Sequence, residues 1–149
     1  MFDHEAVVTL ALRAGQAILG VYNDPSSINV TTKDDDSPLT EADIAAHEII
    51  LKGLSSIDPG TPVVSEEGCL GDPTESDTCW LVDPLDGTKE FIRGNGMYTV
   101  NIALMERRDN SRWSPILGVV HAPEFGITWF GERGMGAMRQ DAGGIGAIS

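Results

Sequence analysis

The sequence has few of the residues that define several common classes of protein. It holds two cysteines, Cys69 and Cys79, which are too few for a disulfide scaffold and whose spacing fits no zinc motif. No apolar run reaches the roughly 18 residues of a membrane-spanning helix. The first five residues include two acidic ones, Asp3 and Glu5, and no lysine or arginine, whereas a secretory signal begins with basic residues. We therefore expect a protein of the reducing cytoplasm, and peripheral association with the inner membrane stays open.

Basic residues are also scarce. The chain has 10 Lys and Arg against 23 Asp and Glu, which gives a net charge of −13. This balance disfavours nucleic-acid binding, because phosphate contacts need lysine and arginine. Between Asp34 and Glu90, 15 acidic residues are opposed only by Lys52 and Lys89. The acidic surplus either keeps the protein in solution or forms a cluster that binds cations.

The pattern of apolar residues predicts two helices within a chain of about one domain. One helix is expected over residues 3–22, with Asp3 as its N-cap. The other should start at Thr40, because Thr40 and Asp43 form a capping-box pattern with aspartate in the place of glutamate or glutamine. Ile57-Asp58-Pro59-Gly60 should end it.

The rest of the chain is mostly of β type. Strands are predicted at residues 28–32, 62–65, 80–82, 97–105, 116–121 and 127–130. Polar loops are expected over 33–38 and 68–78, and residues 131–149, with six glycines, show no clear closing element. Since strands follow strands over short turns, we expect an α+β fold: two helices packed on one face of an antiparallel sheet.

The stretch Asp83-Pro84-Leu85-Asp86-Gly87-Thr88 is the most informative one, because it follows an apolar strand. Proline and glycine in it favour a sharp turn in which the two aspartates converge and the Leu85 carbonyl points outward. The amides of Gly87 and Thr88 can then face an anion. One loop would thus offer two carboxylates, a carbonyl oxygen and anion-binding amides.

These groups are typical ligands of magnesium and phosphate. Glu66 ends another predicted strand, and neighbouring strands lie about 5 Å apart, so the three carboxylates can share a pair of metal ions about 3.5–4 Å apart. The alternative is structural: Asp83 and Asp86 would cap the following turn, and Glu66 and Glu67 would be solvated.

Several motifs together resemble the inositol monophosphatase-like superfamily of lithium-sensitive, magnesium-dependent phosphatases. They are Ser37-Pro38-Leu39-Thr40-x-x-Asp43, Glu66-Glu67 and the stretch from Asp83 to Thr88. The extension Lys89-Glu90-Phe91, with Tyr98 to Leu104, is similar to the CysQ-type 3′(2′),5′-bisphosphate nucleotidases. The resemblance implies that residues 1–149 are the N-terminal, metal- and phosphate-binding domain of a layered αβαβα fold. The family's later Trp-Asp-x-x-Ala motif and its C-terminal α/β domain have no counterpart here.

The resemblance also implies roles for particular residues. The metal ligands would be Glu66, Asp83 and the Leu85 carbonyl for one Mg²⁺, and Asp83 and Asp86 for the other. The substrate phosphate would lie against these metal ligands, including Glu66 and Leu85. Asp86, Gly87 and Thr88 would contact it directly. Thr88 and Asp43 would form a hydrogen-bonded pair that orients the attacking water, although Asp43 is also explained as a helix cap. His47 and His121 have no metal-binding spacing and are expected to be structural.

The implied activity is hydrolysis of 3′-phosphoadenosine 5′-phosphate, a small nucleotide, to AMP and phosphate. The family uses a water activated by Mg²⁺, forms no phosphoenzyme and serves sulfur assimilation. Two alternatives stay open: an inositol monophosphatase, and a non-catalytic acidic module that binds cations or a partner. Without the C-terminal domain, we expect weak Mg²⁺ binding and little turnover.

Overall fold

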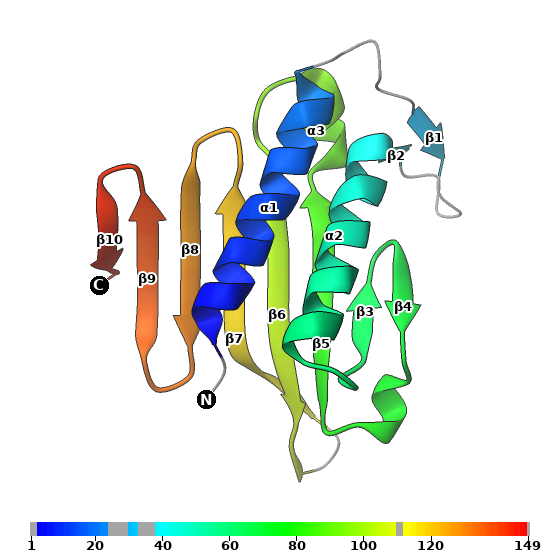
Figure 1. Ribbon diagram of the computed structural model, residues 1–149, viewed down its shortest axis with the longest axis vertical. Coiled ribbons are helices and arrows are strands. Elements are labelled where there is room, and N and C mark those ends of the chain that lie inside the picture. Colours follow the sequence, from blue (N-terminus) through cyan, green and yellow to red (C-terminus); the bar gives the residue numbers. More distant parts are fainter. Residues whose placement is uncertain (1–2, 24–29, 33–37, 110–111, 149) are drawn as a thin grey trace.

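Two long helices lie side by side on one face of an eight-stranded sheet in the computed structural model (Figure 1). The structure describes residues 3–23, 30–32, 38–109 and 112–148. The predicted α+β class, with helices on one face of the sheet, is confirmed. Within these ranges, no helix combines the length and the hydropathy that crossing a bilayer requires.

The first helix, α1, spans His4–Tyr22, as predicted. The Asp3 side chain caps it by accepting the Ala6 backbone N–H at 3.3 Å. The side chains that repeat at helical spacing form its buried face: Val7, Leu10, Ala11, Ala14 and Ile18. This face fixes how α1 lies on the sheet.

The second helix, α2, spans Glu41–Ile57 and begins with the predicted capping box at Thr40 and Asp43. Its C-cap, Asp58, accepts a hydrogen bond from the indole Nε1 of Trp80 at 3.0 Å. Trp80 is fully buried in the sheet below. The end of α2 is therefore tied to the strand that leads into the aspartate motif.

The sheet is antiparallel except at one pair of strands. Its order is β10-β9-β8-β7-β6-β5-β3-β4, and β3 runs parallel to β5. The strands are β3 (Val63–Ser65), β4 (Gly68–Leu70), β5 (Thr78–Asp86), β6 (Thr99–Arg107), β7 (Trp113–Ala122), β8 (Ile127–Glu132), β9 (Gly136–Asp141) and β10 (Gly144–Ala147). Two short strands, β1 (Val30–Thr32) and β2 (Pro38–Thr40), pair apart from this sheet. A short helix, α3 (Thr88–Arg93), follows β5.

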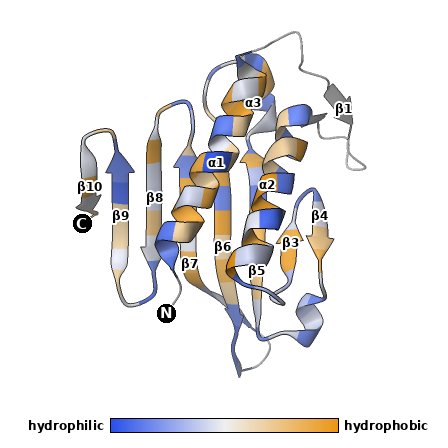
Figure 2. Ribbon diagram, in the orientation of Figure 1, coloured by the Kyte–Doolittle hydropathy of each residue, from blue (hydrophilic) through white to orange (hydrophobic). Residues whose placement is uncertain are grey.

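The core lies between the helices and the sheet, and Figure 2 shows hydrophobic residues along the strands beneath α1 and α2. The predicted alternation of β6 is confirmed, because Val100, Ile102 and Leu104 are all buried. Tyr98, directly before the strand, is buried with them and meets the Phe91 ring edge to face. The core thus anchors both ends of the segment that contains Asp83 and Thr88.

Three sequence-based expectations need correction or fall outside the described ranges. The surface loop predicted over 68–78 is wrong, since it contains β4 and a 3₁₀ turn, Pro73–Glu75. Residues 131–149, which showed no clear closing element in the sequence, contain β9 and β10. Both β4 and β10 are exposed along their whole length, so no alternation of buried and exposed residues marks them. Expectations for 28–29 and 33–37 lie outside the described residues.

Candidate active site

The aspartate motif continues strand β5 instead of forming the sharp turn expected from its sequence. Asp83 pairs with Asn101 of β6, the register then shifts, and Asp86 pairs with Thr99. Pro84 has no N–H to donate, and a bulge is one of the few places where a paired strand accepts proline. The bulge separates the two aspartates: Asp83 is half-buried and Asp86 is exposed.

Gly87 makes the connection from β5 to α3. Its φ of 93° lies in the left-handed region that favours glycine. A Cβ at this position would approach the Met97 carbonyl oxygen to 2.9 Å, so a larger residue would also clash with the backbone. The sequence correctly indicated that Gly87 has a backbone geometry that other residues resist, and this geometry places Thr88 at the start of α3.

Thr88 reaches across to α2, where its hydroxyl donates to Asp43 Oδ1 at 2.9 Å. Asp43 is 0% exposed. Its other oxygen, Oδ2, accepts from the Thr40 backbone N–H at 2.9 Å and from the Thr40 hydroxyl at 2.6 Å. The helix-cap and Thr88-pairing explanations for Asp43 are therefore compatible, because each uses a different oxygen of one carboxylate.

Glu66 and Asp83 are brought to the same place by the parallel pair of strands. Ser65 of β3 lies opposite Val82 of β5, and the Glu66 N–H donates to the Val82 carbonyl at 3.2 Å. Glu66 and Asp83 then line one cavity of about 440 Å³ on the sheet, together with Asn101. One oxygen of Asp83, Oδ1, is buried. The backbone thus juxtaposes two of the three expected carboxylates.

The three carboxylates do not form one cluster in this structure. Across the described ranges, no set of three or more His, Cys, Asp or Glu side chains is close enough to hold a metal ion. Asp86 is exposed beyond the bulge, and carboxylates repel one another when they approach without a counter-charge. The donor types nevertheless fit Mg²⁺, which binds carboxylate and carbonyl oxygens.

Two neighbours of this site were missed by the sequence reasoning. Asn101 was not assigned a role, although a polar residue on the non-core face of β6 was a signal for it. His47 Nδ1 lies 2.9 Å from Ser65 Oγ, which also accepts the Glu67 backbone N–H at 3.3 Å. No sequence spacing predicts this contact between α2 and the end of β3. It anchors the backbone directly beside Glu66.

Comparison with known proteins defines the class of this chain. The model of the inositol monophosphatase family matches residues 3–143, and the chain belongs to this family. The family resemblance inferred from the sequence is therefore confirmed.

The relatives include the 3′(2′),5′-bisphosphate nucleotidase CysQ of Salmonella typhimurium, which is 46% identical over 145 residues. That match covers 93% of this chain and 55% of the relative. The crystal structure of CysQ from Bacteroides thetaiotaomicron is 42% identical with a TM-score of 0.75, covering 93% of this chain and 48% of that one. The suhB protein of Bartonella henselae is 31% identical with a TM-score of 0.81, covering 93% and 52%. The chain thus spans about half the length of these proteins.

Proposed function

We propose that residues 1–149 are the N-terminal, metal- and phosphate-binding domain of a magnesium-dependent phosphatase. Its substrate would be 3′-phosphoadenosine 5′-phosphate, and its products AMP and phosphate. The observation that carries this proposal is the hydrogen bond from Thr88 to the fully buried Asp43. Thr88 follows the aspartate motif, whose Asp83 lines the cavity together with Glu66. The similarity to the CysQ proteins supports the choice of substrate.

The proposed metal ligands come from two neighbouring strands. Glu66, Asp83 and the Leu85 carbonyl would hold one Mg²⁺, and Asp83 and Asp86 would hold another. When bound, the ions would offset negative charge on the phosphoryl group and lower the pKa of a coordinated water. Since Asp86 is exposed, its side chain is free to turn toward Asp83 once a cation balances their charges.

Thr88 would orient the attacking water through its hydroxyl oxygen. The Thr88 proton is held by Asp43 Oδ1, so the lone pairs of the hydroxyl oxygen are directed away from Asp43 and can accept a hydrogen bond from water. The Thr40 bonds to Oδ2 hold the Asp43 carboxylate in this orientation. Asp86, Gly87 and Thr88 would contact the phosphate.

Metal binding can be tested on the 149-residue chain itself, by calorimetric titration with MgCl₂. We expect weak but saturable binding, and the double variant Asp83→Asn with Asp86→Asn should weaken it by at least about tenfold. A double variant Glu75→Gln with Asp77→Asn removes the same charge at two exposed positions and should change affinity by less than about twofold. Equal losses in both variants would show that only the overall negative charge attracts the cation.

Turnover requires a protein of the relatives' full length. Residues 1–143 of this chain can be joined to the remaining portion of the Salmonella relative and assayed for phosphate release. We expect faster release from 3′-phosphoadenosine 5′-phosphate than from inositol 1-phosphate, and loss of both activities in the double aspartate variant with the fold retained. Preference for inositol 1-phosphate would favour the alternative substrate. Mg²⁺ binding without turnover in a folded chimera would favour the non-catalytic module.

A further inference from the structure

A second cavity lies toward the opposite edge of the sheet from β3, between α1 and the strands β8 to β10. Helix α1 packs on β6, β7 and β8, whereas β9 and β10 extend beyond it (Figure 1). The step between the helix and these strands leaves a groove of about 420 Å³. This volume falls within the roughly 300–1,000 Å³ typical of small-molecule sites. The residues that line the groove include His4, Glu5, Phe130, Glu132 and Met138.

Glu132 is a buried carboxylate in the wall of this groove. Its side chain is 9% exposed, and within the described ranges its Oε2 atom is buried and takes part in no hydrogen bond. His4 Nδ1 lies 3.6 Å from this oxygen, which is within ion-pair distance of a protonated ring but beyond hydrogen-bond distance. Because a buried carboxylate oxygen without a hydrogen bond is costly, Oε2 is a strong acceptor for any donor that enters the groove.

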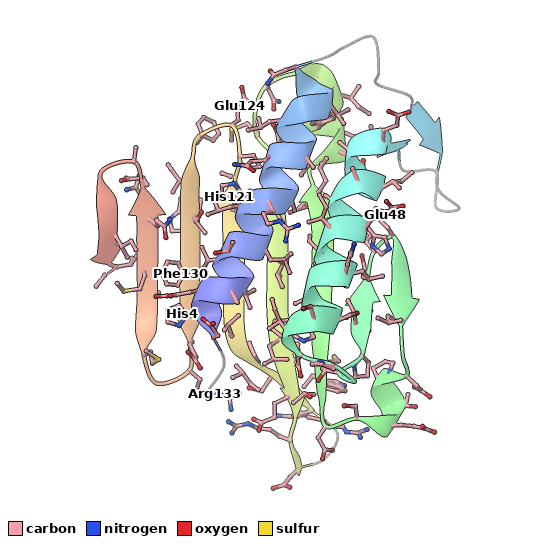
Figure 3. The ribbon with its side chains drawn as sticks, viewed as in Figure 1. His4, Glu48, His121, Glu124, Phe130 and Arg133 are labelled. Atoms are coloured by element: carbon pink, nitrogen blue, oxygen red, sulfur yellow. The ribbon has the colours of Figure 1, made fainter. Side chains whose placement is uncertain are left out.

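The neighbouring arginine does not neutralise Glu132. Arg133 donates to Glu106 at 2.7 Å and to the Pro115 carbonyl at 2.8 Å. Its label lies at the lower end of the sheet in Figure 3, below His4 and Phe130. The Arg133 guanidinium is thus held by other acceptors.

The remaining lining combines an aromatic wall with negative charge. The His4 and Phe130 rings are stacked, with centroids 5.5 Å apart and planes at 18°, and Figure 3 shows the two together at the base of α1. Among the described lining residues, Glu5 adds a second carboxylate, and neither lysine nor arginine occurs. An apolar surface with one buried carboxylate favours a ligand that has an apolar body and a single hydrogen-bond donor.

We propose that this groove binds a small organic cation that consists of an aromatic or apolar body and one ammonium group. The ammonium group donates to Glu132 Oε2, and the body lies along Phe130 and Met138 of the neighbouring strands β8 and β9. The ammonium supplies the donor that the buried carboxylate lacks, and the body displaces water from the apolar wall. This site is separate from the one proposed for phosphate, which involves β3 and β5 toward the opposite edge of the sheet.

The test uses the 149-residue chain and 2-phenylethylammonium as the probe, followed by ¹H–¹⁵N chemical shifts. We expect saturable shifts that centre on α1 and β8 to β10, and an affinity at least about tenfold higher than for the neutral 2-phenylethanol. Equal affinity for the alcohol would reduce the site to an apolar groove and overturn the proposal. Absence of saturable shifts at these residues would overturn it as well.

Two pairs of variants locate the binding group. Glu132→Gln should lower the affinity for the ammonium probe by at least about tenfold, whereas Glu75→Gln, which removes a distant charge, should leave it within about twofold. Met138→Lys places an ammonium group of the chain itself next to Phe130 and should abolish binding, while Met138→Leu should not. Unchanged binding by a folded Glu132→Gln or Met138→Lys variant would overturn the proposal.

Discussion

At the scale of single residues, Asp43 is the group on which most of the candidate site depends. Its two oxygens hold different partners, Thr40 within α2 and Thr88 after β5. One fully buried carboxylate thus caps a helix and links it to the loop that we propose contacts phosphate. The capping half of this role follows from sequence spacing alone, because the partners are three residues apart. The hydrogen bond to Thr88 joins residues that are 45 positions apart in the chain, and only the family resemblance suggested it.

Thr88→Ala removes the hydroxyl donor from Asp43 Oδ1 and leaves that buried oxygen without it. We expect the free energy of unfolding to fall by about 1–3 kcal/mol, the usual cost of depriving a buried acceptor of its partner. Urea denaturation of the 149-residue chain measures this loss. Thr88→Ser keeps the hydroxyl and should lose less than half as much. Equal losses in the two variants would show that the methyl group, rather than the hydrogen bond, stabilises the loop.

At the scale of elements, the packing of α1 on the sheet depends on a small residue at one position. A Cβ on Gly15 would lie 2.7 Å from ring atoms of His121, whose label lies beside α1 in Figure 3. That ring is held in place, because Nδ1 lies 2.8 Å from the Thr128 hydroxyl. Gly20, in the last turn of the same helix, is exposed and has open space around it among the described atoms.

These two glycines make a matched pair for mutation to alanine. Gly15→Ala should destabilise the protein by about 1–3 kcal/mol, because the clash with the imidazole outweighs the gain in helix propensity. Gly20→Ala should stabilise it by about 0.5–1 kcal/mol, since only the propensity term acts there. Thermal unfolding of both variants gives the comparison. A stabilising Gly15→Ala would mean that α1 can move away from the sheet at little cost.

At the scale of the whole molecule, the buried imidazole of His121 links folding to pH. Only 4% of this residue is exposed. Burial lowers the pKa of His121 from its ordinary value near 6.5, and a hydrogen bond with the Ile127 backbone opposes this shift to a smaller extent. The folded protein therefore binds this proton less readily than the unfolded chain does.

Folding stability should accordingly decline as the solution becomes acidic. The contribution of His121 is fully present above about pH 6.5, the unfolded pKa, and is lost as the pH falls toward and through the lower folded pKa. Urea midpoints between pH 7.5 and 5 should fall for the native sequence and fall less steeply for His121→Gln. Parallel curves for the two proteins would assign the acid sensitivity to the carboxylates instead.

Much of the architecture could be predicted because it depends on local patterns. Helical spacing and capping residues predicted α1 and α2, and alternation predicted the buried face of β6. The strands β4, β9 and β10 could not be recognised, since their residues carry little apolar alternation and pairing with a neighbour makes them strands. The turn expected after Asp83 was wrong for a similar reason: pairing with β6 extends the strand through a bulge that no local pattern shows.

For this protein, residue order alone was sufficient to identify the helices, the core alternation and the family motifs, because each depends on neighbours within a few positions. Which distant groups meet was decided by tertiary structure. The parallel register of β3 and β5 places Glu66 beside Asp83, and the packing of α2 brings Asp43 to Thr88. The step between α1 and β9 leaves Glu132 buried in a groove. Such contacts arise from the packing of whole elements, which short-range spacing does not encode.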